Sequence, residues 1–145
     1  YVSQDLLDQA CDLALKLFQR GEEKAAERGL ILVDTKYEFG MIDGELSVID
    51  EIHTADSSRY WVAAEYEEHF TKGESQKMLD KENIRQWLAG EGYMGDGEPP
   101  AIPDDLRVDL AAIYADLHER LLGQAFNPES CASPALIYEV LGETK

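Results

Sequence analysis

The segment Leu30-Ile31-Leu32-Val33-Asp34-Thr35-Lys36-Tyr37-Glu38-Phe39-Gly40 largely decides how this chain of 145 residues folds. It predicts a β-strand in which charged residues fall at every second position. Successive side chains of a strand point to opposite faces, so Asp34, Lys36 and Glu38 are expected on one face. The opposite face, which is suited to a core, would carry Ile31, Val33, Thr35, Tyr37 and Phe39.

Two interpretations of this row of charges remain open from alternation alone. A sheet can hold a carboxylate, an ammonium group and a second carboxylate rigidly, as a site for metal and phosphate requires. Alternatively, the strand faces solvent and its charges pair along it, because antiparallel sheets often have one wet face.

A second apolar run follows and predicts a hairpin. Asp43 and Gly44 form a turn signal, and the next strand is expected from Glu45 to Asp50. If the turn has an odd number of residues, or a bulge intervenes, Glu38 shares a face with Asp50. An even turn would instead place Glu38 with Glu51. A metal site shared by Glu38 and Asp50 predicts the first arrangement.

Helices are predicted on both sides of the hairpin. Apolar residues at helical spacing predict helices over residues 4–20, with an extension to 28 left open, over 77–88, and from 104 or 105 to the glycine at 123. Residues 63–75 have no assignment, and 90–103 are predicted to be a loop. The fold class is therefore α+β: an antiparallel β-hairpin, part of a larger sheet, with packed helices.

Composition predicts one globular domain and excludes some partners. The chain has 13 basic and 30 acidic residues and a formal net charge of −17, which disfavours nucleic acid and anionic membranes. Apolar runs are shorter than the roughly 20 residues of a membrane helix, and no signal peptide is expected. Cys11 and Cys131 match no metal spacing, and Cys11 is expected to be a buried thiol. A cytoplasmic protein is the simplest prediction.

Three motifs, in order, carry a resemblance to a known family. They are Asp34-Thr35-Lys36-Tyr37-Glu38-Phe39-Gly40, Ile49-Asp50-Glu51 and Asp56-Ser57-Ser58-Arg59-Tyr60-Trp61. Together they closely resemble the phosphoribosylaminoimidazole-succinocarboxamide synthases (SAICAR synthetases) of purine biosynthesis. Weaker similarity continues through Leu79-Asp80-Lys81 and Arg85. The resemblance covers a domain over residues 1–123, and residues 124–145 form a tail that it does not reach.

The resemblance implies an ATP-dependent ligase that joins L-aspartate to carboxyaminoimidazole ribonucleotide (CAIR) through an acyl phosphate. ATP and Mg²⁺ would be its cofactors. Glu38 and Asp50 would bind the metal, and Lys36 would contact carboxylate or phosphate oxygens of the substrate as the catalytic residue. Asp34 would orient Lys36 or a substrate hydroxyl, and Arg59 would bind anionic groups. The substrate-binding set is thus Asp34, Asp56, Ser57 and Arg59, with His53 expected either to line the same pocket or to lie elsewhere in the fold.

The resemblance also implies that this chain needs a partner. The family's amino-terminal nucleotide-binding lobe has no counterpart in this sequence, nor does its later arginine with a Gly-Ser pair. The chain therefore resembles the carboxy-terminal half, with the missing amino-terminal half as a partner, and a homo-oligomer is also allowed. The isolated chain is predicted to lack synthetase activity. The alternative is a non-catalytic interaction module that retains the fold.

Overall fold

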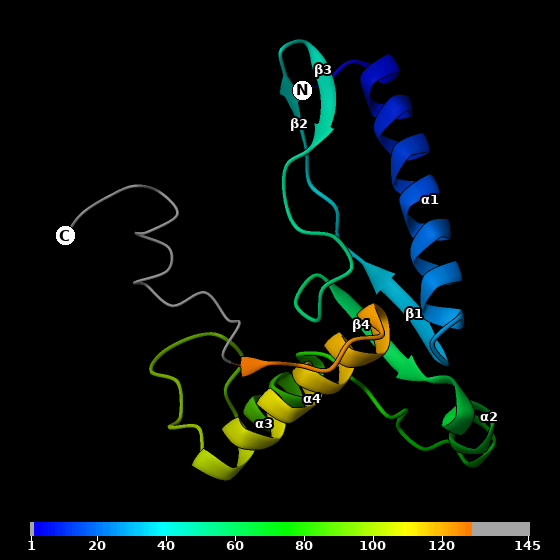
Figure 1. Ribbon diagram of the computed structural model, residues 1–145. Coiled ribbons are helices and arrows are strands. Elements are labelled where there is room, and N and C mark those ends of the chain that lie inside the picture. Colours follow the sequence, from blue (N-terminus) through cyan, green and yellow to red (C-terminus); the bar gives the residue numbers. More distant parts are fainter. Residues whose placement is uncertain (1, 129–145) are drawn as a thin grey trace, which may run out of the picture.

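The computed structural model describes residues 2–128 and has an α+β fold, as the sequence predicts (Figure 1). The elements, in chain order, are α1 (Gln4–Ala26), β1 (Leu30–Thr35), β2 (Phe39–Ile42), β3 (Glu45–Val48), β4 (Ser58–Val62), α2 (Ala63–Lys72), α3 (Glu82–Gly90) and α4 (Asp104–Leu122). The strands form two separate antiparallel pairs, β1 with β4 and β2 with β3. None of the described helices combines the length and the apolar character that a bilayer span requires.

Helix α1 begins as predicted, because the Ser3 hydroxyl accepts a hydrogen bond from the Leu6 amide at 3.3 Å. It runs on through Gly21, which is buried. A side chain at Gly21 would collide with the fold, since its Cβ would lie 2.7 Å from Leu32 Cδ2. The prediction of a buried Cys11 is wrong: the thiol is exposed, and the buried residues of α1 lie near its carboxyl end.

The single strand predicted from Leu30 to Phe39 is divided. Residues 36–38, here called the connector, separate β1 from β2. The expected faces of β1 are also reversed, because Leu30 and Leu32 are core residues with 2% and 4% exposure. Simple alternation would place Asp34 on that buried face. A bulge between Leu32 and Asp34 turns Asp34 to the other side of the sheet, opposite Arg59.

Strand β4 lies at the centre of the fold. One edge pairs with β1, and the other is continued by residues 77–79, where the Leu79 amide donates to the Tyr60 carbonyl at 3.0 Å. Helix α4 covers the resulting core with Leu117. The segment 63–75, which had no assignment, contains α2. The helix is capped at its carboxyl end by Gly73, which has a φ of 68°. The core therefore joins α1, β1, β4, the 77–79 segment and α4, and comprises Ala25, Leu30, Leu32, Tyr60, Val62, Leu79 and Leu117.

The predicted β2–β3 hairpin is confirmed in part. Asp43 and Gly44 form its turn with φ values of 53° and 86°, the positive values that a tight two-residue turn requires. The hairpin extends beyond the β1–β4 pair and lies beside the amino-terminal part of α1 (Figure 1). Met41 and Ile42 are each 53% exposed, so part of the hairpin's apolar surface faces solvent. A lone hairpin is marginal in water, which favours further contacts for it.

Candidate functional site

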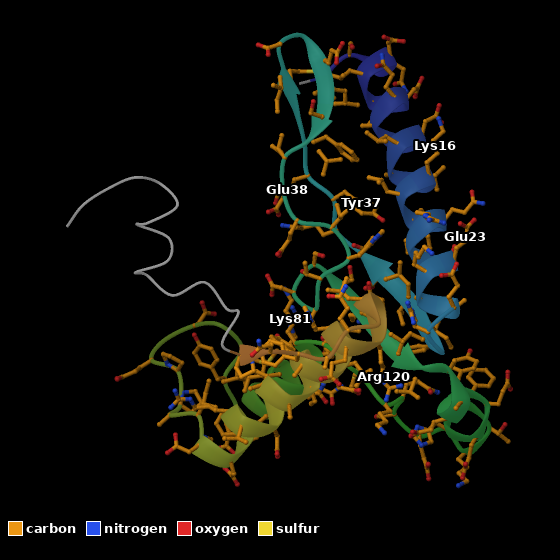
Figure 2. All side chains as sticks on the ribbon, viewed as in Figure 1. Lys16, Glu23, Tyr37, Glu38, Lys81 and Arg120 are labelled. Carbon is orange, nitrogen blue, oxygen red and sulfur yellow. The ribbon has the colours of Figure 1, made fainter. Side chains whose placement is uncertain are left out.

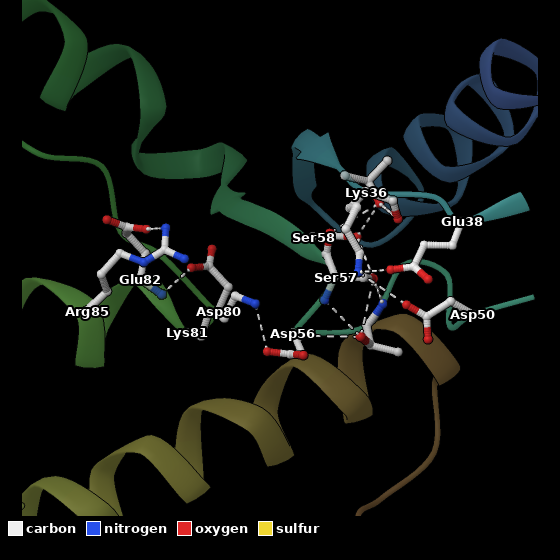
Figure 3. Close-up of polar contacts among 12 residues, drawn as sticks. Lys36, Glu38, Asp50, Asp56, Ser57, Ser58, Asp80, Lys81, Glu82 and Arg85 are labelled. Carbon is white, nitrogen blue, oxygen red and sulfur yellow. Dashed lines mark hydrogen bonds and ion pairs between the residues drawn. The ribbon is translucent and has the colours of Figure 1, made fainter. Parts of the chain in front are cut away.

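A cavity of about 390 Å³ lies where β1, β4, the loop that precedes β4 and the start of α3 meet. All five residues that the resemblance assigns to substrate contact or catalysis line it: Asp34, Lys36, Asp56, Ser57 and Arg59. Lys81, Glu82 and Arg85 also line it, and no role had been assigned to them. Figure 3 shows how residues from these distant segments approach one another. The cavity is called the candidate site below.

Lys36 lies between two carboxylates at the edge of the candidate site (Figure 3). Its Nζ is 2.6 Å from Glu38 Oε1 and 3.3 Å from Asp50 Oδ2. The hydrogen bond with Glu38, followed by that with Asp50, raises the pKa of the Lys36 ammonium group. A hydrogen bond from the Glu51 backbone, followed by that from Lys36, lowers the pKa of Asp50. All these effects favour the charged forms of the groups.

The expected reason for the proximity of Glu38 and Asp50 is wrong. The two-residue turn is the even case, so strand register alone would place Glu38 on the same face as Glu51. The ladder of β2 and β3 ends at Phe39 and Val48, followed by a hydrogen bond of 3.0 Å from the Ile49 amide to the Glu38 carbonyl. Beyond Ile49 the chain leaves the ladder, and Asp50 reaches the same ammonium group as Glu38.

Glu38 and Asp50 are carboxylates, the ligand type that Mg²⁺ takes in proteins. Mg²⁺ is usually held by one or two carboxylates, with substrate phosphates and waters as its other ligands. The Lys36 ammonium group lies between these two carboxylates and neutralises part of their charge. Among residues 2–128, groups of three or more His, Cys, Asp and Glu side chains placed to hold a metal are absent. Two protein ligands are therefore what this part of the chain offers.

Asp34 binds Arg59, not Lys36. The Arg59 Nε donates to both Asp34 oxygens, at 2.9 and 3.0 Å, and a terminal nitrogen of Arg59 also contacts Asp34. These hydrogen bonds are the main cause of a lowered pKa for Asp34 and a raised pKa for Arg59. The bulge in β1 makes the pairing possible, because it brings Asp34 to the face on which Arg59 lies. Asp34 thus orients Arg59. One expectation had been that it would orient Lys36.

Ser57 shapes the loop that presents Asp56. The Ser57 hydroxyl accepts from the Thr54 amide, and the Thr54 hydroxyl accepts from the Ser57 amide, both at 3.1 Å. The Ser57 carbonyl accepts from the Lys36 amide at 3.0 Å, which ties the loop to the connector. Ser57 is only 9% exposed and its hydroxyl is committed to the loop. It therefore builds one wall of the candidate site.

Two cations of α3 and its start complete the candidate site. Lys81 Nζ lies 2.8 Å from Asp56 Oδ1, and Arg85 pairs with Glu82 at 3.1 Å. The hydrogen bond from Lys81 is the main cause of a lowered pKa for Asp56. The spacing of four residues between Lys81 and Arg85 could have suggested one helix face. Nothing local in the sequence, however, shows that this face meets the loop before β4.

Asp80 lies under the start of α3, in the core, and fixes the backbone that carries these cations. Its side chain is fully buried, at 0% exposure. One oxygen accepts from the Tyr60 amide at 2.9 Å and the other from the Glu82 amide at 2.8 Å. Burial raises the pKa of Asp80, while these two hydrogen bonds oppose the rise. Asp80 thereby connects β4, which carries Arg59, to the start of α3.

Replacing Asp80 by asparagine is expected to destabilise the chain by about 1–3 kcal/mol, because one of the two backbone amides would face an NH₂ group instead of an oxygen. Urea unfolding at neutral pH, followed by circular dichroism, measures this change. Asp116→Asn is the matched control, since Asp116 lies on α4 in a surface pair with Arg120. Equal stability of the two variants would contradict the role given to Asp80.

The family model for SAICAR synthetase matches residues 1–100. The phosphoribosylaminoimidazole-succinocarboxamide synthase of Bacteroides fragilis is 48% identical over 123 residues, which are 83% of this chain and 39% of that protein. The synthase of the same name from Legionella pneumophila is 43% identical over 137 residues, 92% of this chain and 44% of that protein. The chain thus spans well under half the length of these relatives.

Solved structures show the same similarity. The SAICAR synthase from Saccharomyces cerevisiae, complexed with SAICAR, matches with a TM-score of 0.70 and 35% identity over 86% of this chain and 40% of that chain. A SAICAR synthetase in complex with ADP matches with a TM-score of 0.60 and 26% identity over 87% of this chain and 42% of that chain. With a family model over residues 1–100 and these structural relatives, the chain belongs to the SAICAR synthetase family.

Proposed function

We propose that this chain forms part of the active site of an ATP-dependent ligase of purine biosynthesis, which joins L-aspartate to CAIR to give SAICAR. In this proposal residues 1–123 are the carboxy-terminal domain of the enzyme, and an amino-terminal portion supplies the rest of the nucleotide site. The observation that carries the proposal is the candidate site itself: Lys36, Arg59 and Lys81 line one cavity, and Lys36 pairs with Glu38 and Asp50. Relatives complexed with SAICAR and with ADP support ligands of this class.

The reaction requires activation of a carboxylate, which is a poor electrophile. Transfer of the terminal phosphoryl group of ATP to a carboxylate oxygen of CAIR gives an acyl phosphate and ADP. The amine of aspartate then attacks the acyl carbon, loses a proton and forms the new C–N bond as phosphate leaves. Positioning and charge neutralisation dominate such phosphoryl transfers. The candidate site offers both, because its cations project from the connector, from β4 and from α3 with its start.

The proposed roles follow from the contacts of each side chain. Lys36 neutralises the oxygens between which the phosphoryl group moves, and Glu38 and Asp50 would hold Mg²⁺. When bound, Mg²⁺ would neutralise the nucleotide phosphates beside these residues. Arg59 binds an anionic group of the substrate while Asp34 fixes its orientation.

Asp56, Ser57 and Lys81 make up the remaining wall. Asp56 holds the Lys81 ammonium group at 2.8 Å, and Ser57 fixes the loop on which Asp56 lies. The whole chain carries a formal net charge of −17, which repels anionic substrates in general. The cavity is less acidic than the chain as a whole, because Lys36, Arg59, Lys81 and Arg85 line it beside Asp34, Glu51, Asp56 and Glu82. Figure 2 shows Lys16 and Glu23 on α1, well apart from Lys81, which lines the cavity.

The isolated chain is expected to form no SAICAR, because the nucleotide needs contacts from the amino-terminal portion. A complex with the amino-terminal portion of the Bacteroides fragilis relative is expected to form SAICAR with one ADP per product. Chromatographic assay of SAICAR and ADP, with CAIR, aspartate and MgATP supplied, measures both. Turnover by the isolated chain would refute the need for the second portion. A folded complex without turnover would favour the non-catalytic interaction module.

A further inference from the structure

His53 has a backbone conformation that non-glycine residues rarely adopt. Its φ is 59°, in the left-handed region, and such outliers concentrate at functional sites. The Tyr60 hydroxyl donates to the His53 carbonyl at 2.9 Å, so β4 holds this backbone in place. His53 does not line the candidate site, and one of the two expectations for it is therefore wrong. Its side chain lies against Gly21 of α1 and Tyr37 of the connector.

The imidazole of His53 is fixed by two contacts. Its Nε2 lies 2.7 Å from the Tyr37 hydroxyl, and the two rings meet edge to face with centroids 5.7 Å apart. The same edge of the ring, with Nε2 and Cε1, also lies against Gly21 of α1. A Cβ at Gly21 would come within 2.6 Å of the imidazole, so glycine leaves the space that the ring occupies. Burial lowers the pKa of His53, which favours the neutral ring in this setting.

Tyr37 is the middle residue of the connector, and its neighbours are Lys36 and Glu38. Figure 2 shows Tyr37 on the side of the connector that faces α1 and Glu38 on the opposite side. Whatever holds the Tyr37 ring therefore sets the direction in which Lys36 and Glu38 project. Backbone hydrogen bonds hold both ends of the connector, at Lys36 and at Glu38, whereas Tyr37 between them contacts His53 through its side chain.

We propose that His53 is a positioning residue for the candidate site: packed against Gly21 and hydrogen-bonded to the Tyr37 hydroxyl, it fixes the connector so that Lys36 and Glu38 meet Asp50. This inference rests on the proposed function for its consequence in catalysis. It assigns a role to His53, Tyr37 and Gly21, which lie outside the candidate site. His53 does not touch the substrate in this account and acts only through Tyr37.

Two backbone amides report on the connector directly. The Lys36 amide donates to the Ser57 carbonyl and the Ile49 amide donates to the Glu38 carbonyl, each at 3.0 Å. The Leu79 amide, which donates to the Tyr60 carbonyl at 3.0 Å, reports on the core instead. Amide hydrogen exchange of the chain, followed by NMR, reads all three independently of metal, nucleotide and turnover.

Tyr37→Phe removes only the hydroxyl that contacts His53. It is expected to speed exchange of the Lys36 and Ile49 amides by roughly ten-fold and to leave the Leu79 amide within about two-fold. Tyr66→Phe, which removes a hydroxyl from a ring stacked on Trp61, is the matched control and should change none of the three.

His53→Gln and His53→Leu separate the effect of the hydrogen bond to Tyr37 from that of backbone strain. Neither replacement is a residue that favours a positive φ, so both are strained at this position. Glutamine can still reach the Tyr37 hydroxyl, so it should retain slower exchange at Lys36 and Ile49 than leucine does. The proposal is overturned if Tyr37→Phe leaves both amides unchanged, or if all three amides speed up together. A complemented wild-type enzyme without turnover would instead count against the proposed function alone.

Discussion

Lys36→Met is expected to lower kcat/KM of the complemented enzyme by roughly a thousand-fold, the scale observed when a charge that stabilises a transferring phosphoryl or oxyanion group is lost. The Lys36 ammonium group lies 2.6 Å from Glu38 and 3.3 Å from Asp50, and Lys36 also lines the cavity. It therefore connects these two carboxylates to the candidate site. Steady-state formation of SAICAR at saturating ATP and aspartate, with CAIR varied, gives the comparison.

The control for this variant is Lys77→Met. Lys77 pairs with Glu65 of α2 at 3.2 Å, outside the residues that line the candidate site. It removes the same charge from the same strongly acidic chain, so it corrects for the change in net charge. A Lys36→Met enzyme within ten-fold of the control would show that Lys36 is a surface charge paired to Glu38.

The combined variant Glu38→Gln and Asp50→Asn is expected to raise the Mg²⁺ concentration at half-maximal rate by roughly ten-fold or more, because Mg²⁺ prefers charged carboxylate oxygens to amide oxygens. It should also lower the maximal rate, since the amides no longer hold Lys36 as an ion pair. Titration of activity with Mg²⁺ at fixed ATP measures both effects. Glu65→Gln serves as the control, and an unchanged Mg²⁺ dependence in the combined variant would exclude these residues as metal ligands.

Local features of the fold could be predicted from the sequence because they depend on neighbouring residues. Ser3 caps α1, Asp43 and Gly44 make the hairpin turn, and Gly123 ends α4 with a φ of 67°. Each relies on hydrogen bonds or torsion angles within a few residues. The apolar repeat of α4 was also sufficient to predict which face of the helix packs on the core, since Leu117, a residue of that repeat, is buried there.

Features that depend on distant partners could not be predicted. The bulge after Leu32 exists because β4 pairs with β1, and it reverses the faces that alternation assigns. The connector interrupts the strand because its two ends join different sheets. The pairing of Asp34 with Arg59 follows from the same bulge. A pattern with a period of two residues contains no signal for an inserted residue.

The residues of the candidate site could be predicted only where they belong to one of the quoted motifs. Residues quoted from three separate motifs line one cavity or flank it, although the register argument for Glu38 and Asp50 was wrong. Asp80 was visible in a weaker motif, but its role is structural and depends on the amides of Tyr60 and Glu82. His53 was noticed for its chemistry, whereas its importance lies in its backbone angle and in its contact with Tyr37.

The most direct test of this account is anomalous X-ray scattering from Mn²⁺, used in place of Mg²⁺, in crystals of the complemented enzyme with ADP. We expect a peak at coordination distance, roughly 2.0–2.2 Å, from carboxylate oxygens of both Glu38 and Asp50, with the ADP phosphates as further ligands. A peak bound elsewhere, with Lys36 still seated between the two carboxylates, would contradict it.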